Sequence, residues 1–413
     1  MTEARSKWKE ISLGELGKWI TGSTPKSSNP LNFGNDVDFV TPSDISYGGI
    51  LGPSERQISH LGASSVRKVK APSVNLVCIG TIGKVALARR EVTTNQQINS
   101  LEVDKAVADP NFVMWLLSSP EIQEKLWESA SSTTVAILNK GNLEKIRTHI
   151  PSLPEQHKIV EILEGHLARL DAALADVKQA KLKAAQFRRS LLQAAFTGNL
   201  SGDGTRLMTA WKTKAVGELA DTQLGKMLNK GKQSGKYAKP YLRTDNVHWG
   251  SFDLSEIKEM DILPDEETKY LATKGDLLMC EGGASGRTAI WNEDYDISFQ
   301  NHVHRIRPKN PKEITPKYLL YFFEWFIKNG FANDLIKGVT ISSLSQSGLR
   351  SIEVSYPPLP EQQKIVEILE GHLSRLDASV AIADAMEKQF SSLRRSLLQA
   401  AFTGQLTKEV ASV

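Results

Sequence analysis

LPEQHKIVEILEGHLARLDAALADVKQAKLKAAQFRRSLLQAAFTGNL occupies residues 153–200, and LPEQQKIVEILEGHLSRLDASVAIADAMEKQFSSLRRSLLQAAFTGQL repeats it at residues 359–406. The two segments are 206 positions apart, and 31 of their 48 aligned positions are identical without a gap. Solenoid units recur every 20–50 residues or so, and a period as long as this one indicates that a whole module was duplicated. We therefore expect a pseudo-two-fold molecule in which any partner bound by one copy is bound twice.

Apolar residues in both segments recur in alternating steps of four and three, which is the spacing of a coiled-coil seam. The seam positions are Ile159, Leu163, His166, Leu170, Ala173, Val177, Ala180, Ala184, Phe187, Leu191 and Ala194 in the first copy, and Ile365, Leu369, His372, Leu376, Ser379, Ala383, Met386, Phe390, Leu393, Leu397 and Ala400 in the second. Leu153-Pro154 marks a start because proline is favoured in a first turn, and Gly198 supplies a stop. Each segment is predicted to be one long helix.

The two copies differ mainly in their middle. All twelve positions from 176 to 187 differ from those at 382–393, whereas both flanks are nearly identical. Helices that pack on each other can match small with large side chains, but surfaces that bind two copies of one partner cannot diverge freely. We infer that the middle forms the seam between the helices and that the flanks bind the partner.

The residues expected to bind this partner lie in the flanks, at equivalent positions of both copies. They are Ile159, Ile162, Leu167, Arg188, Arg189, Phe196, Ile365, Ile368, Leu373, Arg394, Arg395 and Phe402. His166 and His372 lie on the seams and are interpreted as interface histidines rather than as catalytic groups.

Short apolar runs between Gly, Asn, Asp and Pro precede each long helix, as expected of strands and turns. Helical patterns occur there only late, around 110–128 and 316–329. The two regions also match weakly, residues 78–84 with 281–287 and residues 96–98 with 301–303. We expect an α+β globule twice, each followed by its helix, with boundaries at 1–150, 151–206, 207–356 and 357–413.

Composition is that of an ordinary globular protein, with a net charge of +4 and 24% charged residues among 413. No apolar run approaches the roughly 18 residues of a membrane span, and the first residues have no hydrophobic signal core. The two cysteines, Cys78 and Cys280, each sit in an apolar run and are expected to be buried thiols. We expect a cytoplasmic protein with no metal site and no membrane contact.

One stretch concentrates positive charge without any acid. Between Thr222 and Thr244 the basic residues are Lys226, Lys230, Lys232, Lys236, Lys239 and Arg243. A mobile loop of this kind could follow DNA phosphates, where release of counterions drives binding, or could be only a solvated loop.

At this point the chain resembles the specificity subunit of type I restriction-modification systems. The resemblance rests on the LPEQxKIVxIL openings, the RRSLLQAAFTG closings, YLRTDNV at 241–247, GGASGRTAIW at 282–291 and NHVHRIRP at 301–308. It covers essentially the whole chain, including the order of globule, helix, globule and helix.

The resemblance implies that each globule is a target recognition domain that reads one half of an asymmetric, bipartite sequence in double-stranded DNA. It implies that the two helices pack as an antiparallel coiled coil, separate the globules and bind two methyltransferase subunits, which restriction subunits can join. In that family the methyltransferase subunits carry S-adenosylmethionine and methylate adenine N6. The chain itself would then have no cofactor and no catalytic residue.

Base edges are read by polar side chains, with Arg or Lys suited to guanine and Asn or Gln to adenine. The candidates in the first globule are Lys26, Ser43, Asp44, Thr81, Lys84, Gln96, Gln97 and Asn99. Those in the second are Lys230, Lys232, Lys236, Arg243, Asn246, Ser285, Arg287, Asn301, His302 and His304. Because His302 and His304 alternate, both could face one side of a strand; any one candidate could instead be a turn cap or a surface hydrogen bond.

Enzyme motifs fit poorly. In GGASGRT at 282–288 the first glycine of a phosphate loop is missing and Arg287 stands where that loop has lysine. We expect no catalysis by this chain, and two hypotheses remain: a DNA-reading specificity subunit, or a coiled-coil assembly scaffold whose globules bind protein or polysaccharide. Steep loss of DNA affinity with added salt would distinguish the first from the second.

Overall fold

The computed structural model describes residues 5–131, 135–200, 211–229, 231, 233–282, 285–337 and 343–407. The chain forms two compact units. Unit 1 contains residues 1–177 and 384–413, and unit 2 contains residues 178–383. The division passes through both long helices, whereas the sequence pattern places its boundaries at the helix ends.

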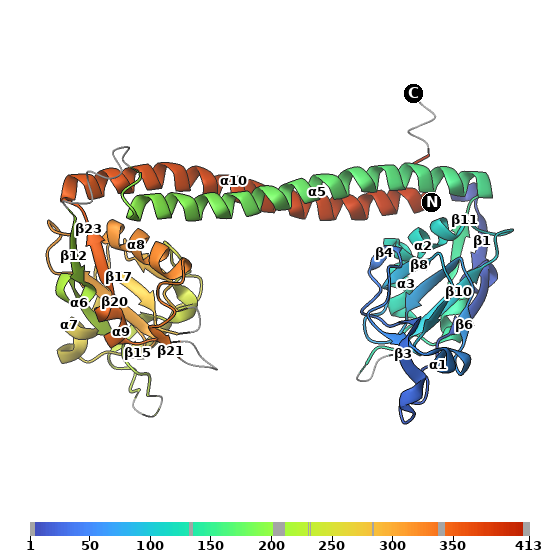
Figure 1. The fold of residues 1–413 in the computed structure, drawn as a ribbon, viewed down its shortest axis with the longest axis horizontal. Helices are drawn as coiled ribbons and strands as arrows, with labels where there is room; N and C mark the ends of the chain where they lie inside the picture. Colours follow the sequence, from blue (N-terminus) through green and yellow to red (C-terminus); the bar gives the residue numbers. More distant parts are fainter. Residues whose placement is uncertain are drawn as a thin grey trace. The chain divides into compact units, whose positions relative to one another are not determined.

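The two repeated segments are helices α5 (Leu153–Phe196) and α10 (Leu359–Phe402), each 44 residues long (Figure 1). At a rise of 1.5 Å per residue each is about 66 Å long. Two residues after the end of each helix stands a glycine with positive φ, Gly198 at 75° and Gly404 at 74°. Glycine adopts this left-handed conformation without steric cost, so the stop predicted from the sequence is confirmed.

Unit 1 is built on a five-stranded sheet in the order β2-β10-β7-β8-β4, with a four-stranded sheet β5-β3-β9-β6 and a separate β1-β11 pair. The strands are β1 (Lys9–Ser12), β2 (Gly17–Thr21), β3 (Phe33–Val40), β4 (Tyr47–Ile50), β5 (Gln57–Ile58), β6 (Lys68–Val69), β7 (Ser73–Val77), β8 (Val85–Ala88), β9 (Val92–Thr94), β10 (Ile98–Val103) and β11 (Arg147–Ile150). The α-helices besides α5 are α1 (His60–Ser64), α2 (Pro110–Ser118), α3 (Pro120–Glu128) and α4 (Lys140–Lys145).

Unit 2 repeats this plan with a four-stranded central sheet, β13-β20-β17-β18, and a four-stranded sheet β15-β14-β19-β16. The strands are β12 (Lys212–Ala215), β13 (Ala220–Leu224), β14 (Ala238–Leu242), β15 (Lys258–Asp261), β16 (Leu271–Ala272), β17 (Leu277–Cys280), β18 (Thr288–Ile290), β19 (Ile297–Phe299), β20 (Val303–Pro308), β21 (Ile336–Lys337), β22 (Ser343–Leu344) and β23 (Glu353–Tyr356). The α-helices besides α10 are α6 (Val216–Leu219), α7 (Glu267–Tyr270), α8 (Pro316–Lys328) and α9 (Gln346–Ser351). The α+β class expected for both globules is confirmed.

Within each unit, the first half of one long helix packs against the second half of the other. In unit 1 the start of α5 and the end of α10 enter one hydrophobic core with α2, and the rings of Phe112 and Phe402 lie 5.3 Å apart. In unit 2 the end of α5 and the start of α10 do the same with α8, and the rings of Tyr318 and Phe196 lie 5.3 Å apart. Start meets end in both units, so the helices run antiparallel, as the resemblance implies.

The repeated glutamine of the LPEQ openings joins each helix to its globule. Gln156 is fully buried, accepts a hydrogen bond from the backbone N–H of Asp109 over 2.9 Å and donates one to the carbonyl of Pro151 over 2.9 Å. Gln362 makes the equivalent bonds to Thr315 N–H over 3.1 Å and to the carbonyl of Pro357 over 2.9 Å. The recurrence of this residue is therefore explained by intramolecular structure.

The flanks of the helices are largely buried inside the chain, which corrects the interpretation of them as partner-binding surfaces. Six of the expected partner-binding residues belong to the two cores and have almost no exposed surface: Ile159, Leu167, Phe196, Ile365, Leu373 and Phe402. Ile162 and Ile368 are half-buried. The flanks are alike in the two copies at least partly because each packs on a globule of the same design.

The middle of the helices is the more exposed part. Val177 and Ala383 are buried as the seam predicts, but Phe187 and Leu393 are 50% and 47% exposed. The seam histidines His166 and His372 are exposed, but the His372 ring of α10 still packs edge-on against Phe187 of α5, with centroids 6.4 Å apart, so the interface position predicted for His372 is confirmed. In the part of the chain that the structure describes, no helix has the length and apolar character needed to span a bilayer.

Candidate functional site

Each central sheet ends in a polar edge formed by the loops that join its strands. In unit 1, β2 and β7 end where β8 and β10 begin, and the surface there consists of residues 21–26, 79–84 and 95–97. In unit 2, β13 and β17 end where β18 and β20 begin, which gives residues 224–226, 281–287 and 300–302, of which 283 and 284 lie outside the described ranges. We call these strand-end surface 1 and strand-end surface 2.

Backbone hydrogen bonds make the two surfaces equivalent. Cys78 N–H donates to the carbonyl of Gln97 over 2.8 Å, and Glu281 N–H donates to the carbonyl of His302 over 2.7 Å. Gln97 and His302 therefore hold the same place in the two units. The weak sequence match between residues 96–98 and 301–303 is confirmed.

A second match concerns the basic residue at the end of the loop that follows β7 in unit 1 and β17 in unit 2. Lys84 Nζ donates to the carbonyl of Pro42 over 3.2 Å, and Arg287 Nη2 donates to the carbonyl of Thr244 over 2.9 Å. Both cations thus bridge the sheet edge to a neighbouring loop through a hydrogen bond to a backbone carbonyl.

Among the base-reading candidates of unit 1, the structure exposes Lys26, Ser43, Thr81 and Gln96 and half-buries Asp44, Lys84 and Gln97. Strand-end surface 1 brings together Lys26, Thr81, Lys84, Gln96 and Gln97. Gln96 Oε1 accepts a hydrogen bond from the Thr24 hydroxyl over 2.5 Å, which orients its amide.

Two candidates in unit 1 serve the fold. Asn99 is buried in β10, where its Oδ1 accepts a hydrogen bond from the Thr21 hydroxyl over 2.7 Å. Asp44 closes a turn by accepting from Thr41 N–H over 2.7 Å and from Glu55 N–H over 2.8 Å. The buried Asn99 corrects the expectation that it reads a base, and the bonds of Asp44 make it a turn cap.

In unit 2 the structure exposes Lys236 and His302, and it half-buries Arg243, Ser285, Arg287 and Asn301. Ser285, Arg287, Asn301 and His302 lie on strand-end surface 2. Arg243 lies 3.5 Å from Glu256 and 3.7 Å from Asp245, so its charge is partly balanced within the protein. Lys230 and Lys232 lie outside the described residues.

His304 and Asn246 are corrections to the sequence expectation, because both are buried. His304 lies within β20, its Nε2 is 3.0 Å from the carbonyl of Leu344, and burial lowers its pKa below the ordinary 6.5. Asn246 caps a turn by accepting from Arg243 N–H over 2.9 Å and donating to the carbonyl of Asp253 over 2.9 Å. His302 precedes the strand, so the two histidines do not share one face.

His302 has an unusual backbone conformation. Its φ is 77°, and among the residues that the structure describes it alone combines a side chain with a positive φ. Its ring is 60% exposed, and Nδ1 lies 3.0 Å from Glu281 Oε2. Glu281 was not predicted from the sequence, because its contact with His302 joins residues of two different strand ends and leaves no local pattern.

The cationic stretch is less positive than its sequence suggests. Lys226 forms an ion pair with Glu266, and Lys239 forms one with Glu267 over 2.5 Å. Asp261 accepts hydrogen bonds from the backbone N–H groups of Ser234 and Gly235 and holds this segment in place. The described part of the stretch is therefore anchored and partly neutralised, and Lys236 is its exposed cation.

The arginines of the helices differ between the units. Arg188 donates to both carboxylate oxygens of the buried Glu324, over 2.7 and 3.1 Å, and Lys328 donates to Glu324 over 2.6 Å. Arg188 pulls the pKa of Glu324 below its usual value against the opposing effect of burial. Arg394, the repeat equivalent of Arg188, pairs with the exposed Asp171 over 2.7 Å.

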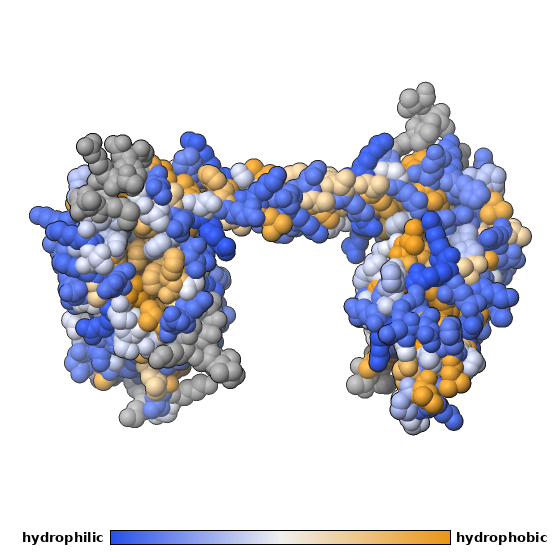
Figure 2. Space-filling view, viewed as in Figure 1, coloured by the Kyte–Doolittle hydropathy of each residue, from blue (hydrophilic) through white to orange (hydrophobic). Residues whose placement is uncertain are grey.

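Exposed side chains beside these arginines leave a surface on each helix. Arg189 and Arg395 are exposed, as are Phe187 and Leu393 two residues earlier. Because side chains two residues apart lie about 200° apart around an α-helix, the arginine and the apolar side chain face different sides. In Figure 2 hydrophobic residues interrupt the hydrophilic surface of both helices. We call residues 187–189 and 393–395 the helix patches.

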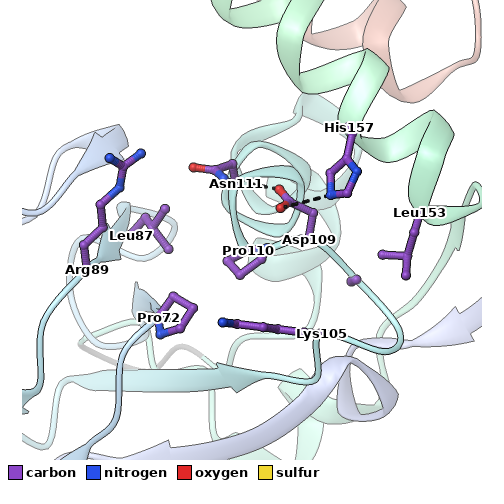
Figure 3. Close-up of a pocket in the computed structure, with 10 residues that line it drawn as sticks. Pro72, Leu87, Arg89, Lys105, Asp109, Pro110, Asn111, Leu153 and His157 are labelled. Atoms are coloured by element: carbon purple, nitrogen blue, oxygen red, sulfur yellow. Dashed lines mark hydrogen bonds and ion pairs between the residues drawn. The ribbon is translucent and has the colours of Figure 1, made fainter.

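A pocket of about 410 Å³ lies at the other end of the unit 1 sheet (Figure 3), near the start of α5. Asp109 and His157 meet there at 3.5 Å, and Asp109 also caps α2 by accepting from Phe112 N–H over 2.9 Å. None of the base-reading candidates lines this pocket. Among the described residues, no group of three or more His, Cys, Asp or Glu is placed to hold a metal ion.

Both cysteines are buried free thiols, as the sequence predicts. Burial raises the pKa of Cys78 to about 11, and burial also raises that of Cys280. A neutral, buried thiol is a poor nucleophile, so neither cysteine is a candidate catalytic group.

Comparison with known proteins gives a family match over most of the chain. The model of the type I restriction modification DNA specificity domain matches residues 5–183 and again 208–384. The specificity subunit of the type I restriction enzyme EcoBI of Escherichia coli is 27% identical over 342 residues, which are 76% of this chain and 69% of that protein. That of EcoDI, also of Escherichia coli, is 25% identical over 97% of this chain and 89% of its own length.

Two solved structures are similar in fold. A chain from work on complex assembly and conformational transition of the type I R-M system superposes with a TM-score of 0.78 at 18% identity, covering 96% of this chain and 98% of that one. The HsdS subunit of Thermoanaerobacter tengcongensis gives 0.58 at 18% identity, with coverage of 96% and 97%.

Proposed function

This chain belongs to the type I restriction modification DNA specificity family, and from that premise we propose that each unit reads one half of a bipartite DNA sequence with its strand-end surface. The chain is the specificity subunit of a type I restriction-modification system. The observation that carries the proposal is the pair of equivalent surfaces, built on the same backbone hydrogen bonds but carrying different polar side chains.

The difference between the surfaces supports an asymmetric target. Identical readers related by a two-fold axis recognise palindromes. Here Gln97 in unit 1 corresponds to His302 in unit 2, and Lys84 corresponds to Arg287. These pairs offer different hydrogen-bonding groups to base edges, so the two half-sites are expected to differ in sequence.

Charge supports DNA as the ligand. Lys26 is exposed in unit 1 and Lys236 is exposed in unit 2, and both are placed in loops rather than in the cores. Such lysines contact phosphates, which position the protein without carrying sequence information. Binding should then weaken steeply as salt is added.

The helices are proposed to dock two methyltransferase subunits, with the helix patches as the contact surfaces. Arginine is among the residue types that most often anchor an interface, and Phe187 and Leu393 add exposed apolar surface on another side of each helix. The partner subunits would hold S-adenosylmethionine and methylate adenine N6, restriction subunits would join them, and this chain would contribute recognition without catalysis.

The test is to co-express the chain with its methyltransferase and to map methylated adenines on genomic DNA. A single bipartite motif with two unlike halves is the expected result. The complex should also prefer a duplex with that motif over a scrambled duplex, and lose affinity with added salt. Methylation without a motif, or binding that salt does not change, would contradict the proposal and favour a protein-binding scaffold.

A further inference from the structure

We propose that His302 and Glu281 form a two-residue reader on strand-end surface 2 that selects a base by its exocyclic amino group. This inference rests on the proposed function, because it requires that strand-end surface 2 meets the major groove. It assigns the preference for one kind of base in the second half-site to one side chain of the protein, His302.

Glu281 determines which nitrogen of the His302 ring carries the proton. A carboxylate only accepts hydrogen bonds, so Nδ1, 3.0 Å from Glu281 Oε2, must be the donor. In a neutral imidazole the other nitrogen, Nε2, then carries a lone pair and accepts. In the major groove, hydrogen bonds to such an acceptor come from adenine N6 and cytosine N4, while guanine O6 and thymine O4 do not donate.

The pair is held rigidly on both sides. The backbone N–H of Glu281 donates to the carbonyl of His302 over 2.7 Å, and the carbonyl of Glu281 accepts from Leu344 N–H over 2.8 Å. The Glu281 side chain is only 14% exposed, whereas the His302 side chain is 60% exposed. The carboxylate is thus part of the sheet edge, and the imidazole projects from it.

The backbone of His302 is strained in a way that favours this presentation. A positive φ at a residue with a side chain is uncommon, and such strained residues cluster at functional sites. Its equivalent in unit 1, Gln97, occupies the same place in the hydrogen-bond pattern without a positive φ. The strain therefore belongs to the reader of the second half-site and not to the shared fold.

The experiment measures DNA binding by the complex of this chain with its methyltransferase. Each adenine or cytosine of the second half-site is replaced, one at a time, by an analogue that lacks the exocyclic amino group. One replacement should weaken binding of the unchanged complex by about three- to tenfold, the effect of one lost hydrogen bond. The same replacement should cost the His302→Gly complex less than about twofold, because glycine adopts positive φ without strain and has no side-chain acceptor.

Glu281→Gln tests the positioning role. A glutamine can accept from or donate to Nδ1, so either nitrogen of the ring can carry the proton. This variant should therefore bind about equally well when the contacted base pair is inverted, a change that a merely structural effect of Glu281 would not produce. Gln97→Ala is the matched control and should leave every second half-site preference unchanged.

The possible failures are distinguishable. If the complex has no sequence preference at all, the proposed function is wrong. If the complex has a preference but the His302→Gly complex loses as much affinity as the unchanged complex at every replaced base, the reader assignment is wrong. The assignment is equally overturned if replacing a guanine of the second half-site by 7-deazaguanine weakens binding only when His302 is present. His302 would then donate a hydrogen bond to guanine N7 rather than accept one.

Discussion

Arg188 of α5 donates a hydrogen bond from Nη1 to Asp377 Oδ1 of α10 over 2.8 Å. Arg394 and Asp171, which stand 206 positions away from Arg188 and Asp377 respectively, repeat the contact over 2.7 Å. In each unit, one helix supplies the arginine and the other supplies the aspartate. Neither repeated module can therefore complete its own unit, because half of its helix belongs to the core of the other.

We expect Arg188→Ala to destabilise unit 2 far more than Arg394→Ala destabilises unit 1. Removing Arg188 leaves buried Glu324 with Lys328 as its remaining partner, and breaking buried ion pairs is costly, so the loss should be about 2 kcal/mol. The exposed pair of Arg394 should contribute about 0–1 kcal/mol. Hydrogen exchange of α8 and α2 amides measures the two effects separately.

The matched control for this comparison is the double variant Arg188→Ala, Glu324→Ser. It removes the buried carboxylate together with its partner and should recover part of the lost stability. If Arg188→Ala and Arg394→Ala lower the stability of their units equally, the buried ion pair between Arg188 and Glu324 contributes no more than the exposed pair of Arg394.

Gln362→Leu should cost about 3 kcal/mol of unfolding free energy. The change leaves Thr315 N–H and the carbonyls of Glu313 and Pro357 without their buried partner, and each unsatisfied group costs about 1–3 kcal/mol. Gln363→Leu is the control, because Gln363 is exposed and should change stability by less than about 0.5 kcal/mol. Urea unfolding of the two variants measures both losses. Similar midpoints would show that the buried hydrogen bonds of Gln362 do not stabilise the attachment of α10 to its globule.

The stability of unit 2 should fall as the pH is lowered from 6.5. Burial holds the pKa of His304 in the folded chain below its ordinary 6.5. At pH values between the lowered pKa and 6.5, the unfolded chain therefore binds a proton at His304 that the folded chain does not. Stability is then complete above pH 6.5 and decreases toward acid, by up to about 1.4 kcal/mol per pH unit. Glu281 and His302 are the charged or titratable groups that act on His304.

His304→Gln should remove this component, because an amide donates to the Leu344 carbonyl without titrating. The measurement is the melting temperature between pH 5 and 7, above the range in which the carboxylates protonate. A slope that persists unchanged in the variant would assign the effect to another group.

Gln96 and Asn99 should separate base reading from structure in unit 1. Gln96 is exposed on strand-end surface 1, so Gln96→Ala should relax the first half-site of the methylation motif and leave the melting temperature unchanged. Asn99 is buried and bonded to Thr21, so Asn99→Ala should destabilise the unit by about 1–3 kcal/mol. A motif unchanged by Gln96→Ala would exclude this residue as a reader.

Phe187→Asp and Leu393→Asp should each weaken binding of one methyltransferase copy by at least about tenfold, because each introduces a charge into a helix patch. Mass measurement of the assembled complex should show loss of one copy for each change. Leu182→Asp is the control, since Leu182 is also exposed on α5 but lies outside the patches. If the complex keeps both methyltransferase copies in both patch variants, the docking surface lies outside the helix patches.

Features with a local cause were predictable. Helices α5 and α10 begin at Leu153 and Leu359 as the Leu-Pro signals predict, and both end just before the expected glycine. The equivalence of Lys84 with Arg287 was also visible, because short motifs survive where a loop must keep its backbone bonds. Hydrogen-bond geometry within a few residues carries this information.

Burial was harder to predict from the sequence. Asn99, Asn246 and His304 were expected to read bases because the residue type alone does not show whether a polar side chain is buried or exposed. Phe187 and Leu393 fit the heptad spacing, but a helix face is covered only where another element reaches it. Identity between the two flanks likewise has two causes, a common partner or a common core, and the sequence does not distinguish them.

By itself, then, the sequence determined the duplication, the two long helices and the α+β character of what precedes them, because periodicity and turn residues act over a few positions. Tertiary structure alone decided which halves of the helices share a core, which polar residues reach solvent, and that Glu281 fixes the ring of His302. These depend on contacts between segments far apart in the chain, which no local pattern encodes.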